Sequence, residues 1–148
     1  MEFILKYQIL CSSIFGWAAA QITKTFIHMI INKKFSAERL VGTGGMPSSH
    51  SATVCGLATA VGINYGLSSV EFALAAVFAI VVMYDALGVR RETGRQAVVI
   101  NEMMEMFKNM GKDMSATDRL KEFVGHSPLQ VLVGAIMGIG IAFIVCLL

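Results

Sequence analysis

The sequence predicts an all-α integral membrane protein, a helical bundle with about four transmembrane helices plus one amphipathic interfacial helix. Apolar residues make up 55% of the chain and charged residues only 15%, whereas a soluble domain of this size needs more charge to cover its surface. The mean hydropathy is +0.67, and the apolar residues are gathered in long segments. We expect the 148 residues to form a single membrane domain.

Four apolar segments have about the 20 residues that a helix needs to cross the hydrocarbon of a bilayer. They cover residues 3–31, 49–67, 69–87 and 128–148. A very short turn around Gly66–Ser69 makes the second and third spans an antiparallel hairpin. Two glycine pairs with GxxxG spacing, Gly62/Gly66 and Gly134/Gly138, allow helices to approach closely. Packing within one bundle is favoured over dimerisation for both pairs.

The segment 88–127 is the long polar stretch between the third and fourth spans. Within it, Ala97, Ile100, Met104 and Phe107 recur at helical spacing, and polar residues occupy the other side. This pattern predicts an amphipathic helix that lies on the membrane surface or caps the bundle.

Lys and Arg are concentrated in the segments 32–48 and 88–127. With four spans, these two segments share one side of the membrane, and the positive-inside rule makes that side cytoplasmic. We therefore expect a protein of the bacterial inner membrane, with its site at the cytoplasmic face and both termini outside. The formal net charge is only +2, which excludes a nucleic-acid binder driven by a strong basic field.

The sequence does not predict a metal site or another cofactor. Cys11, Cys55 and Cys146 lie far apart inside apolar stretches, which predicts buried free thiols rather than a disulfide framework or a zinc site. Paired carboxylates and His-x-x-x-His spacing are also missing from the sequence, so we expect chemistry without a metal.

A Gly-rich turn leads into the second span. Pro47, Ser48 and Ser49 are typical of a helix start, and His50 follows directly. Backbone N–H groups at such a start, with the helix dipole behind them, favour an anion. The structural alternative is a tight loop with an ordinary cap.

Polar residues also interrupt or end two other spans. Gln21 and Lys24 share one face of the first span, and an ionisable residue inside a span is a functional candidate because it is costly there. Snorkelling of the Lys24 amine to the interface is the alternative. Asp85 ends the third span and needs a cationic partner such as Lys24. Arg90 and Arg91 follow it and suit phosphate recognition, or they are a positive-inside stop signal.

The fourth span begins with helix-capping signals. Ser127 is the expected N-cap, Pro128 the first helical residue and Gln130 the partner in a capping box. His126 would stand just before the positive end of this helix, which favours a neutral, nucleophilic imidazole and an anionic phosphoryl group on it. A histidine that merely ends a surface loop is the alternative for this segment taken alone.

Two histidines, an in-membrane lysine, several arginines and a Gly-rich helix start thus converge on one face from four segments. Cations, a nucleophile and a general acid are the components of phosphoryl transfer. The motifs MPSSHSA at 46–52, YDA at 84–86 with GVRR at 88–91, and GHSP at 125–128 resemble the divergent branch of the type-2 phosphatidic acid phosphatases. That branch is also described as acid phosphatase/vanadium-dependent haloperoxidase-related.

The resemblance implies a membrane phosphatase that hydrolyses a lipid phosphate or diphosphate through a metal-independent phosphohistidine. It makes His126 the nucleophile and His50 the general acid, while Gln130 stands where the wider superfamily has the acid that orients the nucleophile. The expected phosphate-binding residues are Lys24, Arg39, Arg90, Arg91, Ser48 and Ser49, and the expected orienting residues are Gln21 and Asp85. The superfamily's Lys-x6-Arg-Pro motif is missing as such, and Lys24 and Arg39 are candidates for its role.

Two rival functions remain open at this point. The first is a non-catalytic lipid-headgroup binder that keeps the cations but has lost turnover through Gln130. The second is a small transport or assembly subunit that uses Lys24 and Asp85 as an intramembrane pair. The expected partners are a lipid phosphate substrate and membrane lipids. Because four spans are fewer than the six typical of membrane phosphatases, a homodimer would be one way to complete or bury the site.

Overall fold

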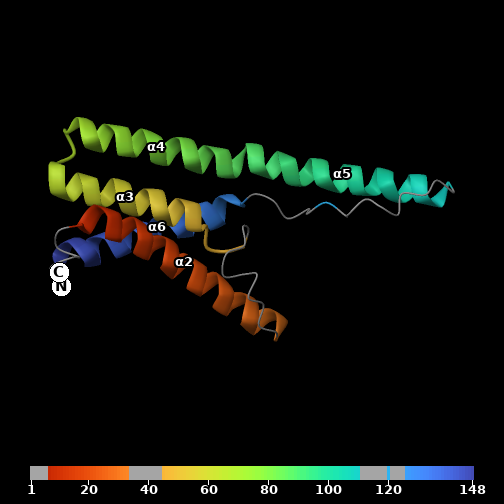
Figure 1. Cartoon of the computed structure of the whole chain (residues 1–148), viewed down its shortest axis with the longest axis horizontal. Coiled ribbons are helices and arrows are strands. Elements are labelled where there is room, and N and C mark those ends of the chain that lie inside the picture. Colours follow the sequence, from red (N-terminus) through yellow and green to blue (C-terminus); the bar gives the residue numbers. More distant parts are fainter. Residues whose placement is uncertain (1–6, 34–44, 111–119, 121–125) are drawn as a thin grey trace.

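The computed structural model describes residues 7–33, 45–110, 120 and 126–148. Within these residues the secondary structure consists of helices alone, which are α2 (Gln8–Asn32), α3 (Ser49–Tyr65), α4 (Val70–Leu87), α5 (Val89–Asn109) and α6 (Pro128–Leu147). Helices α2, α3, α4 and α6 form a bundle, and α5 runs on from α4 beyond it (Figure 1). The predicted all-α membrane bundle is thus confirmed.

Helix α3 lies at the centre of the bundle, where it packs against α2, α4 and α6. Its buried residues are mostly small and include Ser49, Ser51, Ala52, Gly56 and Ala60. Small side chains let several helices approach the same helix closely. A Cβ on Gly56, for example, would lie 2.9 Å from the backbone oxygen of Ser12 on α2.

Among the described residues, three helices are long and apolar enough to cross a membrane: α2, α6 and the continuous run from Val70 to Asn109 that contains α4. The central helix α3 has 17 residues, which at 1.5 Å per residue is about 26 Å, slightly less than the hydrocarbon core of about 30 Å. The helix bounds agree with the predicted spans to within a few residues, and residues 3–6 of the first span lie outside the described residues.

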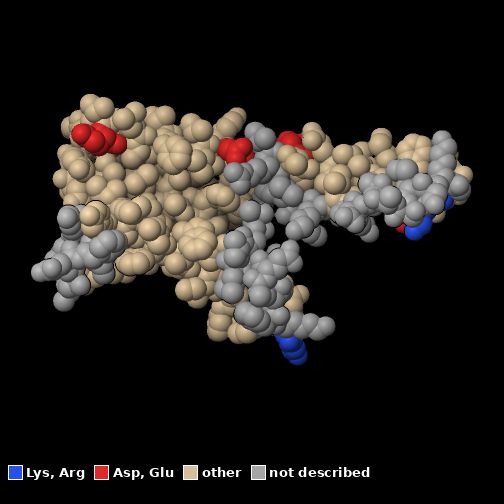
Figure 2. All heavy atoms as spheres, viewed as in Figure 1, with Lys and Arg blue, Asp and Glu red and all other residues tan. Residues whose placement is uncertain are grey.

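The outer surface of the bundle is apolar. Leu74 and Val77 on α4, and Leu132 and Ile136 on α6, are each more than half exposed. Charged side chains on the face shown in Figure 2 gather toward the ends of the bundle and over α5 rather than over its middle. A large apolar surface of this kind suits contact with lipid.

The Gly134/Gly138 pair packs within the bundle, as predicted, whereas Gly62 and Gly66 belong to the α3–α4 hairpin and its turn. A Cβ on Gly134 would overlap the backbone oxygen of Ser48, and one on Gly138 would overlap that of Ala52, so α6 lies directly against the backbone of α3. Gly62 packs against side chains of its own hairpin. Gly66 has a φ of 87° in the turn between α3 and α4, a conformation that glycine adopts without strain.

Helix α5 corrects one of the two predicted placements of the amphipathic segment. The helix continues away from the bundle (Figure 1) and does not cap it. The reason is that backbone hydrogen bonding passes through the junction: Gly88 N–H donates to Tyr84 O, and Glu92 N–H donates to Gly88 O. Farther along, the Asn101 side chain donates to the backbone oxygen of Leu120 and accepts from its N–H.

Candidate active site

The two histidines that the sequence singled out meet in the folded chain. His50 lies in the first turn of α3, and His126 lies two residues before α6. Their ring centroids are 6.0 Å apart, with an interplanar angle of 80°, which is an edge-to-face arrangement. His126 is only 3% exposed. Two imidazoles from distant parts of the sequence thus lie together at the same end of the bundle.

His126 is fixed by backbone bonds on both of its sides. Its N–H donates to the backbone oxygen of Ala86 in the last turn of α4. Ser127 then caps α6, because its hydroxyl accepts from the N–H of Gln130 while the Gln130 side-chain oxygen accepts from the N–H of Ser127. This is the predicted capping box, and it sets the direction in which the chain enters α6.

The start of α3 is fixed to the start of α6. Ser48 is the N-cap of α3, and its hydroxyl accepts from the N–H and the hydroxyl of Ser51. The Ser48 N–H in turn donates to the backbone oxygen of Gln130 at 3.0 Å. Ser48 and Ser49 are both buried. The positive ends of two helix dipoles therefore lie next to each other and next to the two histidines, which favours an anion there.

Lys24 and Gln21 belong to the same end of the bundle. Lys24 is only 4% exposed and Gln21 only 5%, so both side chains point into the protein rather than into lipid. The stem of Lys24 lies against the Gly-rich turn, since a Cβ on Gly45 would be 3.3 Å from Lys24 Cγ. The predicted proximity of the first span to the α3 start is thus present in the structure.

Asp85 is half-buried in the last turn of α4, next to Ala86, whose oxygen holds His126. Arg90 and Arg91 belong to the first turn of α5, and their side chains lie outside what the structure describes, as does the whole of Arg39. Among the described residues, no group of three or more His, Cys, Asp and Glu side chains is placed to hold a metal ion.

The family model described as "Divergent PAP2 family" matches residues 5–141 of the chain. The chain belongs to the divergent PAP2 family. It is also similar to the uncharacterized membrane protein YuiD of Bacillus subtilis (strain 168), at 40% identity over an alignment of 148 positions that covers 94% of this chain and 93% of the relative. No solved structure matches the chain.

In this divergent PAP2 chain, Gln130 has the structural role that the capping-box pattern predicted. The oxygen that could orient the His126 imidazole accepts the Ser127 N–H in the capping box, so it holds the chain beside His126. Orientation of the imidazole itself by Gln130 stays a prediction.

Sequence reasoning also missed Ser51 and Ala86. Ser51 is fully buried and supports the Ser48 cap, a role that its place three residues after an N-cap serine could have suggested. Ala86 contributes only a backbone oxygen, for which the sequence carries no signal.

Proposed function

We propose that this divergent PAP2 protein is a membrane phosphatase that hydrolyses a lipid phosphate or diphosphate through a phosphohistidine. The observation that carries the proposal is the pairing of His50 and His126 at 6.0 Å between ring centroids, beside two helix N-termini. A nucleophile needs to lie about 3–3.5 Å from phosphorus, and a general acid within about 2.6–3.2 Å of the leaving oxygen. Two rings at this separation suit one phosphoryl group bound at their edges.

The reaction would take place in two steps. His126 attacks phosphorus, the bond from phosphorus to the lipid oxygen breaks, and His50 donates a proton to that oxygen. His50 then accepts a proton from water, whose oxygen attacks phosphorus as the bond to His126 breaks. Inorganic phosphate leaves, and both imidazoles return to their starting states.

Positive groups around the histidines would hold the phosphate. Lys24 is a buried cation against the Gly-rich turn, and the starts of α3 and α6 add two positive dipole ends. These positive groups attract an anion more strongly in a low-dielectric region than they would in water. In this proposal Arg39, Arg90 and Arg91 complete the phosphate site from the neighbouring segments.

The direct test is phosphate release by the purified protein in detergent, offered lipid monophosphates and diphosphates. We expect release that survives a divalent-metal chelator and is inhibited by vanadate, because vanadate can take the shape of the transferring phosphoryl group at His126. Loss of activity in the chelator, with recovery on adding a divalent cation, would show that the metal-free mechanism is wrong.

A non-catalytic headgroup binder is the second candidate, favoured by one observation. Gln130 provides a cap rather than a carboxylate beside His126, and a neutral amide stabilises an imidazolium less well than a carboxylate does. Saturable binding of a lipid phosphate without phosphate release from any substrate would select this function over the phosphatase.

We also propose that the protein resides in a bacterial inner membrane with the histidines at the cytoplasmic face. The support is the positive-inside rule, together with the gathering of the α3 start, the α6 start and α5 at one end of the bundle (Figure 1). The proposal includes a homodimer only in one role, in which a second copy of the chain covers the histidine site further.

The sidedness can be tested with single cysteines at Asn109 and Ser68, in a background without the three native thiols. Asn109 ends α5, and Ser68 lies in the α3–α4 turn at the opposite end of the molecule. We expect a membrane-impermeant thiol reagent to label Ser68→Cys in intact cells and Asn109→Cys only after lysis. The reverse pattern would place the histidines at the outer face.

A further inference from the structure

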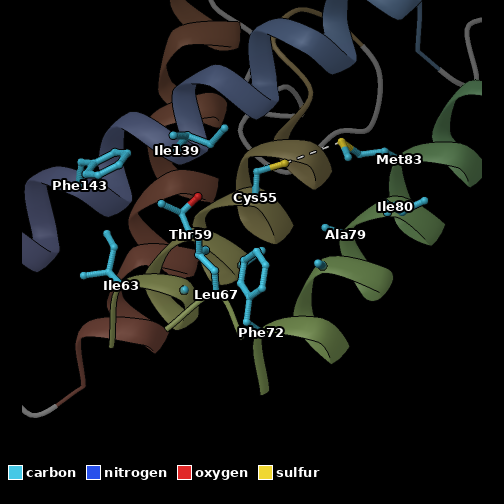
Figure 3. A pocket seen from close by; sticks show the side chains of 13 residues that line it. Cys55, Thr59, Ile63, Leu67, Phe72, Ala79, Ile80, Met83, Ile139 and Phe143 are labelled. Atoms are coloured by element: carbon cyan, nitrogen blue, oxygen red, sulfur yellow. Dashed lines mark hydrogen bonds between the residues drawn. The ribbon is translucent and has the colours of Figure 1, made fainter. Parts of the chain in front are cut away.

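A groove runs between α3, α4 and α6 below the histidines. Its volume is about 610 Å³, within the range of small-molecule sites. Figure 3 shows Cys55 and Met83 at one end of the groove and Phe72 at the other, with Phe143 of α6 along its side. Apart from the hydroxyl of Thr59, the side chains that line it are apolar.

Small residues open this groove. Gly62 on α3 and Ala76 on α4 are among the residues that line it. The Phe72 ring packs over Gly62, where a Cβ would lie 3.1 Å from a ring carbon. Gly62 and Phe72 of the α3–α4 hairpin thus form the end of the groove that lies farther from the histidines.

The end of the groove formed by Cys55 and Met83 lies within about one to two helix turns of the candidate active site. Met83 is three residues before Ala86, whose backbone oxygen holds His126, which is about 4.5 Å along α4. On α3, the lining begins at Cys55 and extends to Ile63, about 7.5 to 20 Å along the helix axis from His50. Half of a bilayer core is about 15 Å, so the groove passes from just below the histidines to beyond the midplane.

We propose that this groove holds one long hydrocarbon chain of the lipid phosphate whose headgroup the two histidines bind. This inference rests on the proposed function and names its substrate class: a phosphate on a chain long enough to reach the bilayer midplane. Other lipid chains can enter the groove, but only a lipid that ends in phosphate reaches His50 and His126 at the same time. The hydrocarbon chain moves into the groove from lipid and not from water, so its binding is favoured by close packing rather than by the hydrophobic effect. The bound hydrocarbon chain also raises the reaction rate, because it orients the phosphate at the histidines.

The first experiment measures phosphate release from alkyl monophosphates, from butyl to hexadecyl, at equal surface fraction in mixed micelles. We expect kcat/KM to rise about tenfold with chain length, through better positioning of the phosphate. Ala76→Phe fills the groove and should lose this rise while it keeps the rate on butyl phosphate. The matched control is Ala73→Phe, one turn earlier on α4 and exposed outside the groove, which should behave like the wild type. An unchanged chain-length profile in Ala76→Phe would overturn the groove inference and leave the phosphatase standing.

The second experiment does not depend on turnover. An alkyl phosphate with a photoreactive diazirine at the end of its chain is irradiated with the protein, and the labelled residues are identified by mass spectrometry. Label on groove residues such as Thr59, Ile80 and Phe143, competed by hexadecyl phosphate, supports the inference even if no phosphate is released, in which case the phosphatase alone has failed. Label spread over outward residues such as Leu74 and Val77, without competition, overturns the inference even if phosphate is released.

Discussion

Replacing His126 with alanine should reduce phosphate release to background, because the substitution removes the atom that forms the covalent intermediate. Its backbone N–H would still donate to Ala86 O, and the capping box that follows would remain, so the fold should be kept. Phosphate release by His126→Ala and the wild type, with equal thermal midpoints, measures this effect. Trapping of labelled phosphate on wild-type protein, and not on the variant, would identify the intermediate directly.

His50→Ala provides the matched comparison, because its loss should depend on the leaving group. With a lipid alkoxide, which needs protonation, we expect a loss of about 10²–10⁴-fold. With an aryl phosphate, whose leaving oxygen needs little protonation, the loss should be much smaller. If His126→Ala keeps wild-type turnover while His50→Ala slows all leaving groups equally, both role assignments are wrong and the headgroup binder is the better interpretation.

Gly138→Ala should destabilise the protein strongly, whereas Gly140→Ala on the same helix should not. A Cβ on Gly138 would overlap the backbone oxygen of Ala52, and one on Gly140 meets nothing within 4 Å. Overpacking of this kind costs about 1–3 kcal/mol, while alanine in place of glycine in an open helical position is favourable by up to about 1 kcal/mol. The two substitutions therefore have opposite expected signs for the free energy of unfolding.

The measurement can use the native thiols. Cys11 and Cys55 are buried and should react with a thiol-specific fluorophore only as the bundle opens, so the thermal midpoint in detergent can be read from labelling. Gly138→Ala should lower that midpoint, and Gly140→Ala should leave it unchanged or raise it. Equal midpoints for the two variants would contradict the close contact between α6 and α3.

The sequence by itself determined the class of the protein and the starts of α3 and α6. Long apolar runs require helices in lipid, because unpaired backbone groups are too costly there, and Ser48 and Ser127 carry their own capping signals. These are local or compositional properties, so no tertiary information was needed to find them.

The direction of α5 was decided by the tertiary structure and not by the sequence pattern. Its amphipathic pattern was predicted correctly, but the pattern is compatible both with a helix that caps the bundle and with one that runs on from α4 away from it. The backbone bonds through Gly88 select the second of these in the structure.

The site was predicted as a set of residues, and only the tertiary structure decided which of them meet. His50 and His126 were selected for their chemistry, but their 6.0 Å separation depends on α6 lying against the backbone of α3 at Gly134 and on the bond from His126 to Ala86. The groove between α3, α4 and α6 had no sequence signal, because a cavity is the space that three helices leave between them. Helix starts follow from short-range preferences of neighbouring residues, whereas contacts between helices depend on packing among distant residues.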